Sequence, residues 1–327
     1  MPPTATNLQP ALPSAVGPVS GALLDHLACR APRRHYVPVP APVADTEPLG
    51  QDLQLALYVS YELHHRGFAG VDARWEWDPG VLQLRSRLEE AFGTALRDGV
   101  GDVSQTKAVD EIPRLCTQPS PLAEYLREHG TWAQMREYFV QRSVYRVRTD
   151  DASSSDGMTP AKFGESAFGA ADHAPRRRFA EVLRAAGLDA TYLHYLDEAS
   201  AEALAMVNMM SMFSLYGNLR GAASGQVLAT RIAVRSASAG LVDALVRFGA
   251  PQPCVQFYRD NVRTGLKARC ETVGALLDAE PELESEVVLG IRAFELLERR
   301  FTTRLLTRWV EQRATDRQET QADRSIR

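Results

Sequence analysis

The sequence contains few cysteines, and none of them belongs to a paired motif. Cys29, Cys116, Cys254 and Cys270 lie far apart in the chain. Zinc knuckles and thioredoxin-like sites need two cysteines at Cys-x-x-Cys spacing, so both kinds of site are excluded. We therefore expect four reduced thiols, as in a protein of the cytosol.

An excess of basic residues is also absent, and so is a long apolar run. The formal net charge is −4, so the chain offers no general positive field for the phosphates of nucleic acid. The longest apolar stretch, around residues 203–215, is too short and too interrupted to span a bilayer, and the N-terminus lacks the apolar segment of a signal peptide. We expect a cytoplasmic protein that binds neither nucleic acid nor membranes.

Proline is concentrated at the start of the chain. Residues 1–48 hold ten of the nineteen prolines, and a segment this rich in proline is not expected to sustain a helix or a central strand. The sequence therefore predicts an extended arm over residues 1–48.

Helical spacing of apolar residues dominates from Gln51 onward, and strand-like alternation is nearly absent. Residues 149–164 are rich in aspartate, serine and glycine, which favours a loop. Glycine and proline then separate the helices that we expect at 177–186, 201–216, 225–234, 240–248, 255–277 and 282–312. The sequence predicts an all-α multi-helix bundle over 49–313, followed by a charged, flexible tail over 314–327.

One of these helices carries half of a metal-binding pattern. Glu62 and His65 are one helical turn apart and share a helix face. A dimetal bundle needs a second helix of this kind, and no second Glu-x-x-His follows in the sequence. We favour the interpretation in which Glu62 and the two histidines, His64 and His65, pair within the fold, for example with Arg66 or Asp72.

Two further segments fit core packing better than ligand binding. Trp75 and Trp77 flank Glu76 and are expected to anchor a loop against the bundle. Four methionines fall on one apolar helix, where this flexible side chain fills gaps between helices. They are Met206, Met209, Met210 and Met212.

The segments Tyr61-Glu-Leu-His-His-Arg-Gly-Phe-Ala-Gly-Val-Asp72 and Trp75-Glu-Trp-Asp-Pro79 resemble the entry segment of the iron-containing redox enzyme family. Residues 141–145, 205–213 and 219–222 agree with this resemblance, which extends over about residues 50–312. It implies a haem-oxygenase-like helical fold in which three core helices hold two irons that activate dioxygen. The substrates that it implies are amino acids, fatty acids or natural-product intermediates.

The resemblance also implies a set of iron ligands, and most of them are missing here. The first glutamate aligns with Glu165, but the histidine position falls on Pro175, with His173 two residues away. The glutamate position of the second core helix is Arg231. The three positions on one face of the third core helix read Asn261, Gly265 and Ala268. Glycine and alanine cannot coordinate a metal through a side chain, and a guanidinium repels one.

Three hypotheses follow for the function. The first is a metal-free protein that binds or modifies a small molecule derived from a natural product, an amino acid or a fatty acid, and that needs no cofactor. Its pocket would be lined by Glu165, Gln226, Arg231, Asn261, Gly265 and Ala268. Arg231 would recognise an anionic substrate there, and it could also pair with Glu165. The sequence assigns no catalytic residue.

The second hypothesis is a pseudoenzyme that partners an active homologue, and a homodimer is equally open. The third is a working iron-dependent oxidase or oxygenase with iron as its cofactor. Its iron would be held by an unusual ligand set, namely Glu62, His64, His65, Glu165 and His173.

Overall fold

The computed structural model describes residues 9–29, 37–99, 123, 126, 174–247, 249–263 and 266–326. Every regular element within these residues is helical, which confirms the predicted all-α fold. The α-helices are α1 (Pro18–Leu27), α2 (Gln51–His65), α3 (Pro79–Gly99), α7 (Ala174–Ala185), α8 (Ala201–Leu215), α9 (Arg220–Arg247), α10 (Gln252–Arg263), α11 (Leu266–Ala279) and α12 (Glu284–Ile326).

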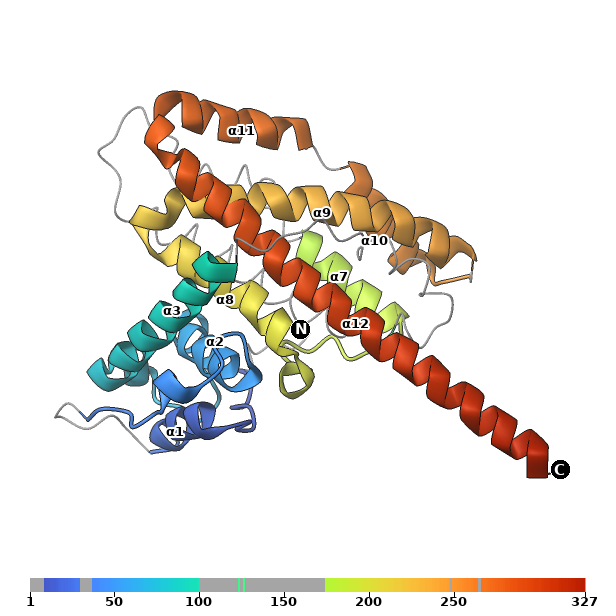
Figure 1. The fold of residues 1–327 in the computed structure, drawn as a ribbon, viewed down its shortest axis with the longest axis horizontal. Helices are drawn as coiled ribbons and strands as arrows, with labels where there is room; N and C mark the ends of the chain where they lie inside the picture. Colours follow the sequence, from blue (N-terminus) through green and yellow to red (C-terminus); the bar gives the residue numbers. More distant parts are fainter. Residues whose placement is uncertain are drawn as a thin grey trace, which may run out of the picture.

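The helices form a bundle in which α8 lies between the first and the last parts of the chain. Helices α1, α2 and α3 gather at one end, and α12 runs obliquely past α8 and α9 (Figure 1). Helix α2 packs against α8 and α3, whereas α9 packs against α12, α10 and α11. Residues 203–213 of α8 are all buried, as expected for a helix that is covered on every side. The predicted core role of its methionines is confirmed.

The crossing of α9 and α12 is unusually close because glycine lies on both helices. A Cβ atom added to Gly225 would lie 2.0 Å from the carbonyl oxygen of Val287. A Cβ atom added to Gly290 would lie 1.9 Å from the carbonyl oxygen of Ala222. Only a residue without a side chain fits at these two positions.

Two of the predicted helix boundaries are wrong. The helices predicted over 225–234 and 240–248 are not separate, because residues 225–234 and 240–247 belong to the single helix α9, which continues through Gly240. A glycine inside a helix costs only about 1 kcal/mol, and the burial of Leu241 and Leu245 on the following turns offsets that cost. The predicted helix over 255–277 is instead divided, because α10 ends at Arg263 and α11 begins at Leu266.

The prediction of an extended arm over residues 1–48 is wrong for residues 18–27, which form α1. Pro18 occupies the first turn of this helix, where proline removes no intrahelical hydrogen bond. The carboxylate of Asp52 accepts hydrogen bonds from the backbone N–H groups of Val19 and Ser20, at 2.9 and 2.7 Å. Leu23 is fully buried, so α1 is a packed part of the bundle.

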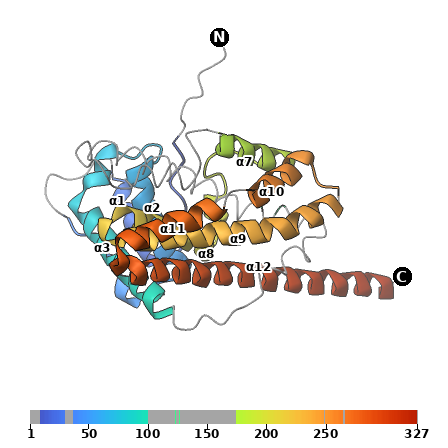
Figure 2. The ribbon, with the colours of Figure 1, turned by 90° about the horizontal axis from the view of Figure 1, so that it is seen from above.

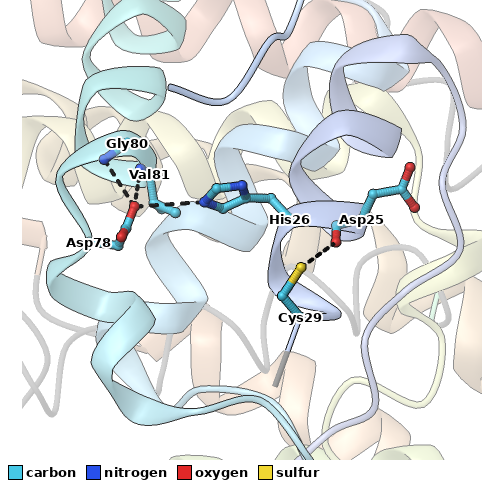
Figure 3. Close-up of polar contacts among 6 residues, drawn as sticks. All are labelled: Asp25, His26, Cys29, Asp78, Gly80 and Val81. Carbon is cyan, nitrogen blue, oxygen red and sulfur yellow. Dashed lines mark hydrogen bonds and ion pairs between the residues drawn. The ribbon is translucent and has the colours of Figure 1, made fainter. Parts of the chain in front are cut away.

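The arm also contacts the start of α3, as Figure 3 shows. Asp78 caps α3, because its Oδ1 atom accepts the N–H groups of Gly80 and Val81 at 2.9 and 3.1 Å. His26 of α1 points toward this carboxylate, with 3.8 Å between Nε2 and Oδ1. The exposed thiol of Cys29 lies nearby, 3.8 Å from the carbonyl oxygen of Asp25. The start of α3 and the end of α1 are therefore packed together.

The predicted flexible tail is helical as far as Ile326, because α12 has 43 residues. No glycine or proline lies between residues 314 and 326, so no residue of this stretch is a strong helix breaker. Figure 2 shows the end of α12 projecting beyond the other helices. Among the helices of the described ranges, none is both long and apolar enough to cross a membrane.

Candidate functional site

Arg231 lies on the face of α9 that turns toward the interior. Ser224, Val227 and Ser238 are four or seven residues away from it, so they share its face, and all three are buried. Arg231 itself is half-buried. The fold thus places one permanently charged guanidinium at a half-buried position of a core helix.

Asn261 lies on the inward face of α10 in the same way. Cys254 and Tyr258 precede it by seven and three residues, and both are buried. Helix α10 packs against α9 and also against α7, where the thiol of Cys254 lies 3.7 Å from the carbonyl oxygen of Val182. Asn261 is half-buried. Arg231 and Asn261 therefore lie on inward faces of two helices that pack together.

Gln226 occupies a different face of α9. Its side-chain nitrogen donates to the hydroxyl of Thr230 at 2.9 Å, and that hydroxyl donates to the carbonyl oxygen of Gln226 at 2.8 Å. Five residues separate Gln226 from Arg231, so their side chains leave the helix about 140° apart. The structure buries Gln226 and pairs it within its own helix.

The remaining predicted site residues are not gathered with these. Ala268 lies on α11 and Asn261 on α10, so the prediction that they share one helix face is wrong. The two helices run separately in Figure 1. Glu165, His173 and Gly265 lie outside the described residues. Pro175 falls in the first turn of α7, where proline is tolerated.

Glu62 is the centre of a buried hydrogen-bond network. Tyr58, one turn earlier on α2, donates its hydroxyl to Glu62 Oε2 at 3.2 Å. Tyr192, which precedes α8, donates to both carboxylate oxygens at 3.2 and 3.1 Å. The guanidinium of Arg66 lies 4.5 Å from the centre of the Tyr192 ring, a cation–π contact. This network joins α2 to a segment 130 residues away.

Burial determines which groups of this network carry protons. Burial raises the pKa of Tyr58 and of Tyr192 well above the usual range, and the negative charge of Glu62 raises both further. Both phenols are therefore neutral donors at physiological pH. The prediction that Glu62 pairs within the fold is confirmed, but its hydrogen-bond partners are Tyr58 and Tyr192.

The two histidines beside Glu62 are buried as well, and one of them has a carboxylate partner. His64 Nδ1 lies 2.8 Å from Glu76 Oε1, and the His64 ring lies edge-on to Trp77 at 5.0 Å. Trp75 is buried and anchors its loop as predicted, whereas Trp77 is 59% exposed and does not. The partner of His64 is thus Glu76, where the sequence favoured Arg66 or Asp72.

A second tyrosine–carboxylate network surrounds Glu89 on α3. Tyr61 donates its hydroxyl to Glu89 Oε1 at 2.9 Å, and Tyr216 donates to Glu89 Oε2 at 2.6 Å. Arg85 Nε lies 3.6 Å from Oε1. Sequence reasoning did not select these residues, and the only signal was that Tyr61 and Arg85 each fall on the same helix face as an apolar stripe.

The described residues do not fit a diiron site. Two irons need several carboxylates and imidazoles in mutual reach. Within the described ranges, no three side chains of histidine, cysteine, aspartate or glutamate lie close enough together to hold a metal ion. Glu62 accepts hydrogen bonds from two phenol hydroxyls, and His64 pairs with Glu76. These side chains therefore hold α2 against its neighbours.

The described helices form an all-α bundle, which is consistent with a haem-oxygenase-like fold. Residues 167–299 match the family model of the iron-containing redox enzymes. The match includes α9 and α10 but not the segments 61–72 and 75–79, on which the resemblance was first noted. No curated protein matches the chain.

Proposed function

We propose that the chain is a metal-independent member of this family that binds a small organic acid between α7, α9 and α10. The observation that carries the proposal is the placement of Arg231 and Asn261 on the inward faces of two paired helices. A diiron enzyme of this family would carry acidic and imidazole ligands at these positions. Here the pair offers a cation and an amide.

Such a pair suits a carboxylate ligand. A guanidinium can bind both oxygens of a carboxylate in parallel, and the half-buried setting of Arg231 strengthens that attraction relative to water. The amide of Asn261 both donates and accepts, so it can bind a second polar group of the same molecule. The ligand class that this favours is an amino acid, a fatty acid or an acidic natural-product intermediate.

The proposed protein needs no cofactor and works in the cytoplasm. It requires no metal cofactor, and catalysis, if the ligand is modified at all, would be non-oxidative. Cys29, Cys254 and Cys270 are free thiols, which supports a reducing compartment such as the cytoplasm.

Metal content is the first test. The protein is expressed in iron-replete medium, its iron is measured by elemental analysis, and the measurement is repeated after anaerobic reconstitution with Fe(II). We expect far less than one iron per chain in both samples. A content of about two irons per chain, as in dimetal bundles, would overturn the proposal and favour an iron-dependent oxidase or oxygenase.

Ligand binding is the second test, with Arg231→Gln and Arg235→Gln as matched variants. Arg235 lies one turn further along α9 and is exposed, so its loss removes the same charge from the helix at an exposed position. In a thermal-shift screen of carboxylic acids, a hit at a hundred times its Kd adds about 2.7 kcal/mol of stability. We expect Arg231→Gln to lose this shift and Arg235→Gln to keep it. Equal shifts in both variants would refute the assignment of Arg231.

A further inference from the structure

The outward face of α12 is exposed to solvent over much of its length. Ala293, Leu297 and Phe301 are buried on the side of the helix that packs against the bundle. The opposite side carries eight residues at spacings of three and four, and each of them is exposed or half-buried. We call them the outer stripe, namely Ser285, Val288, Arg292, Glu295, Arg299, Thr303, Leu306 and Val310. Figure 1 shows α12 running across the front of the bundle.

The outer stripe has apolar residues toward both ends and charged residues in its middle. Val288 lies toward one end and is 38% exposed, whereas Leu306 and Val310 lie at the other, where Val310 is 57% exposed. Charges of both signs, on Glu295 and Arg299, lie between them. The pattern is therefore nearly the same in both directions along the helix. A surface of this kind is complementary to itself across a two-fold axis.

We propose that a second copy of this chain docks on the outer stripe, with the two α12 helices antiparallel. Val288 and Leu306 are equally far from residue 297, and so are Glu295 and Arg299. A single register centred on this residue therefore brings Val288 against Leu306 of the second copy, and Glu295 against Arg299 of the second copy. The two-fold axis repeats both contacts, so the interface gains two apolar pairs and two pairs of opposite charge.

The same arrangement gives the end of α12 a neighbour. The last turns of this helix project beyond the other described helices, as Figure 2 shows, and a helix of a few turns is marginal in water when it stands alone. In the proposed register Val310 lies opposite Glu284, where the second copy's α12 begins. The turns after Val310 then reach the second copy's η6 (Pro281–Leu283), which directly precedes that start. Docking thus covers a segment that the described part of one chain leaves projecting.

The test measures self-association of the full chain by analytical ultracentrifugation over a series of dilutions. We expect twice the mass of one chain at high concentration, with dissociation on dilution and in high salt, because the charge pairs lie near the surface. Glu295→Arg sets like charges against each other at both pairs and should raise the Kd of the dimer at least about tenfold. Combining it with Arg299→Glu restores opposite charges and should recover most of the lost affinity. A loss of folding would not be reversed in this way.

Val288→Asp tests the apolar pair, and Val246→Asp is its matched control. Val246 is 55% exposed on α9 and lies outside the outer stripe. A carboxylate buried against Leu306 would have no partner, so Val288→Asp should also raise the Kd at least about tenfold, whereas Val246→Asp should leave it unchanged. The mass of one chain at every wild-type concentration, an unchanged Kd in Glu295→Arg, or an equal loss in Val246→Asp would overturn the proposal. None of these results depends on iron content or on ligand binding at Arg231.

Discussion

The glycine crossing of α9 and α12 allows a direct test of the fold. In Gly290→Ala, the new methyl carbon would lie 1.9 Å from the carbonyl oxygen of Ala222, whereas ordinary contacts begin at 3.4 Å. The three nearest atoms all belong to the backbone of Ala222, so no side-chain rotation relieves the clash. Overpacking of a core costs about 1–3 kcal/mol and occasionally more, against about 1 kcal/mol gained from the helix propensity of alanine. Because the clash is with backbone atoms, we take the cost at about 3 kcal/mol or more, and we expect the free energy of unfolding to fall by about 2 kcal/mol or more.

Gly274→Ala provides the control on α11. No atom lies within 4 Å of a Cβ added there, so this variant should gain about 0.5–1 kcal/mol from propensity alone. Both free energies of unfolding are measured by urea denaturation followed by circular dichroism. The slope of the free energy against urea concentration should be the same in each variant as in the wild type, so that a shift of the midpoint reports a change in stability. If Gly290→Ala were stabilised as Gly274→Ala is, the close approach of the two helices would be wrong.

Three further outcomes can be checked by the same kind of measurement. Glu62→Ala removes the carboxylate that accepts hydrogen bonds from buried Tyr58 and half-buried Tyr192, and should cost about 2–4 kcal/mol; a cost below about 0.5 kcal/mol, the level of an ordinary surface substitution, would contradict the network. Burial, with Glu295 nearby, raises the pKa of Glu298 from 4.5 to about 7. The folded state then binds this proton more tightly than the unfolded chain, so its contribution to stability falls as pH rises from about 4.5 to about 7. Glu298→Gln should match the wild type near pH 4 and exceed its stability near pH 8; a constant difference across this range would refute the pKa. Asp52→Ala removes the cap of α1 and should cost about 1 kcal/mol, with faster amide exchange in α1 and unchanged exchange in α9.

The sequence predicts the helices well where apolar periodicity is strong. The apolar run of α8 and its methionines reach the core as expected, since a segment that is apolar on every side has no other stable environment. Periodicity does not reveal where a helix continues through a weak residue. Gly240 was interpreted as a boundary, and the packing of Leu241 and Leu245 overrides its low propensity.

The candidate site was predicted only in part, because its partners are distant in sequence. The pattern around Glu62 indicates a pairing carboxylate, but nothing in that segment points to Tyr192. Glu89 depends on Tyr216 in the same way, across 127 residues. Proline content misled the prediction for residues 18–27, since Pro18 occupies the one position of a helix that it suits and Asp52 provides the cap.

The long separations of the α2 contacts have a consequence for folding kinetics. Asn208 of α8 donates to Gln54 across 154 residues, and Gln51 donates to the carbonyl oxygen of Ala199 across 148. Each contact closes a long loop, and that entropic cost precedes any gain from packing. The pairs α8–α9 and α9–α10 are adjacent in sequence and close only short loops. Helix α2 should therefore gain its protection from amide exchange after these pairs during refolding.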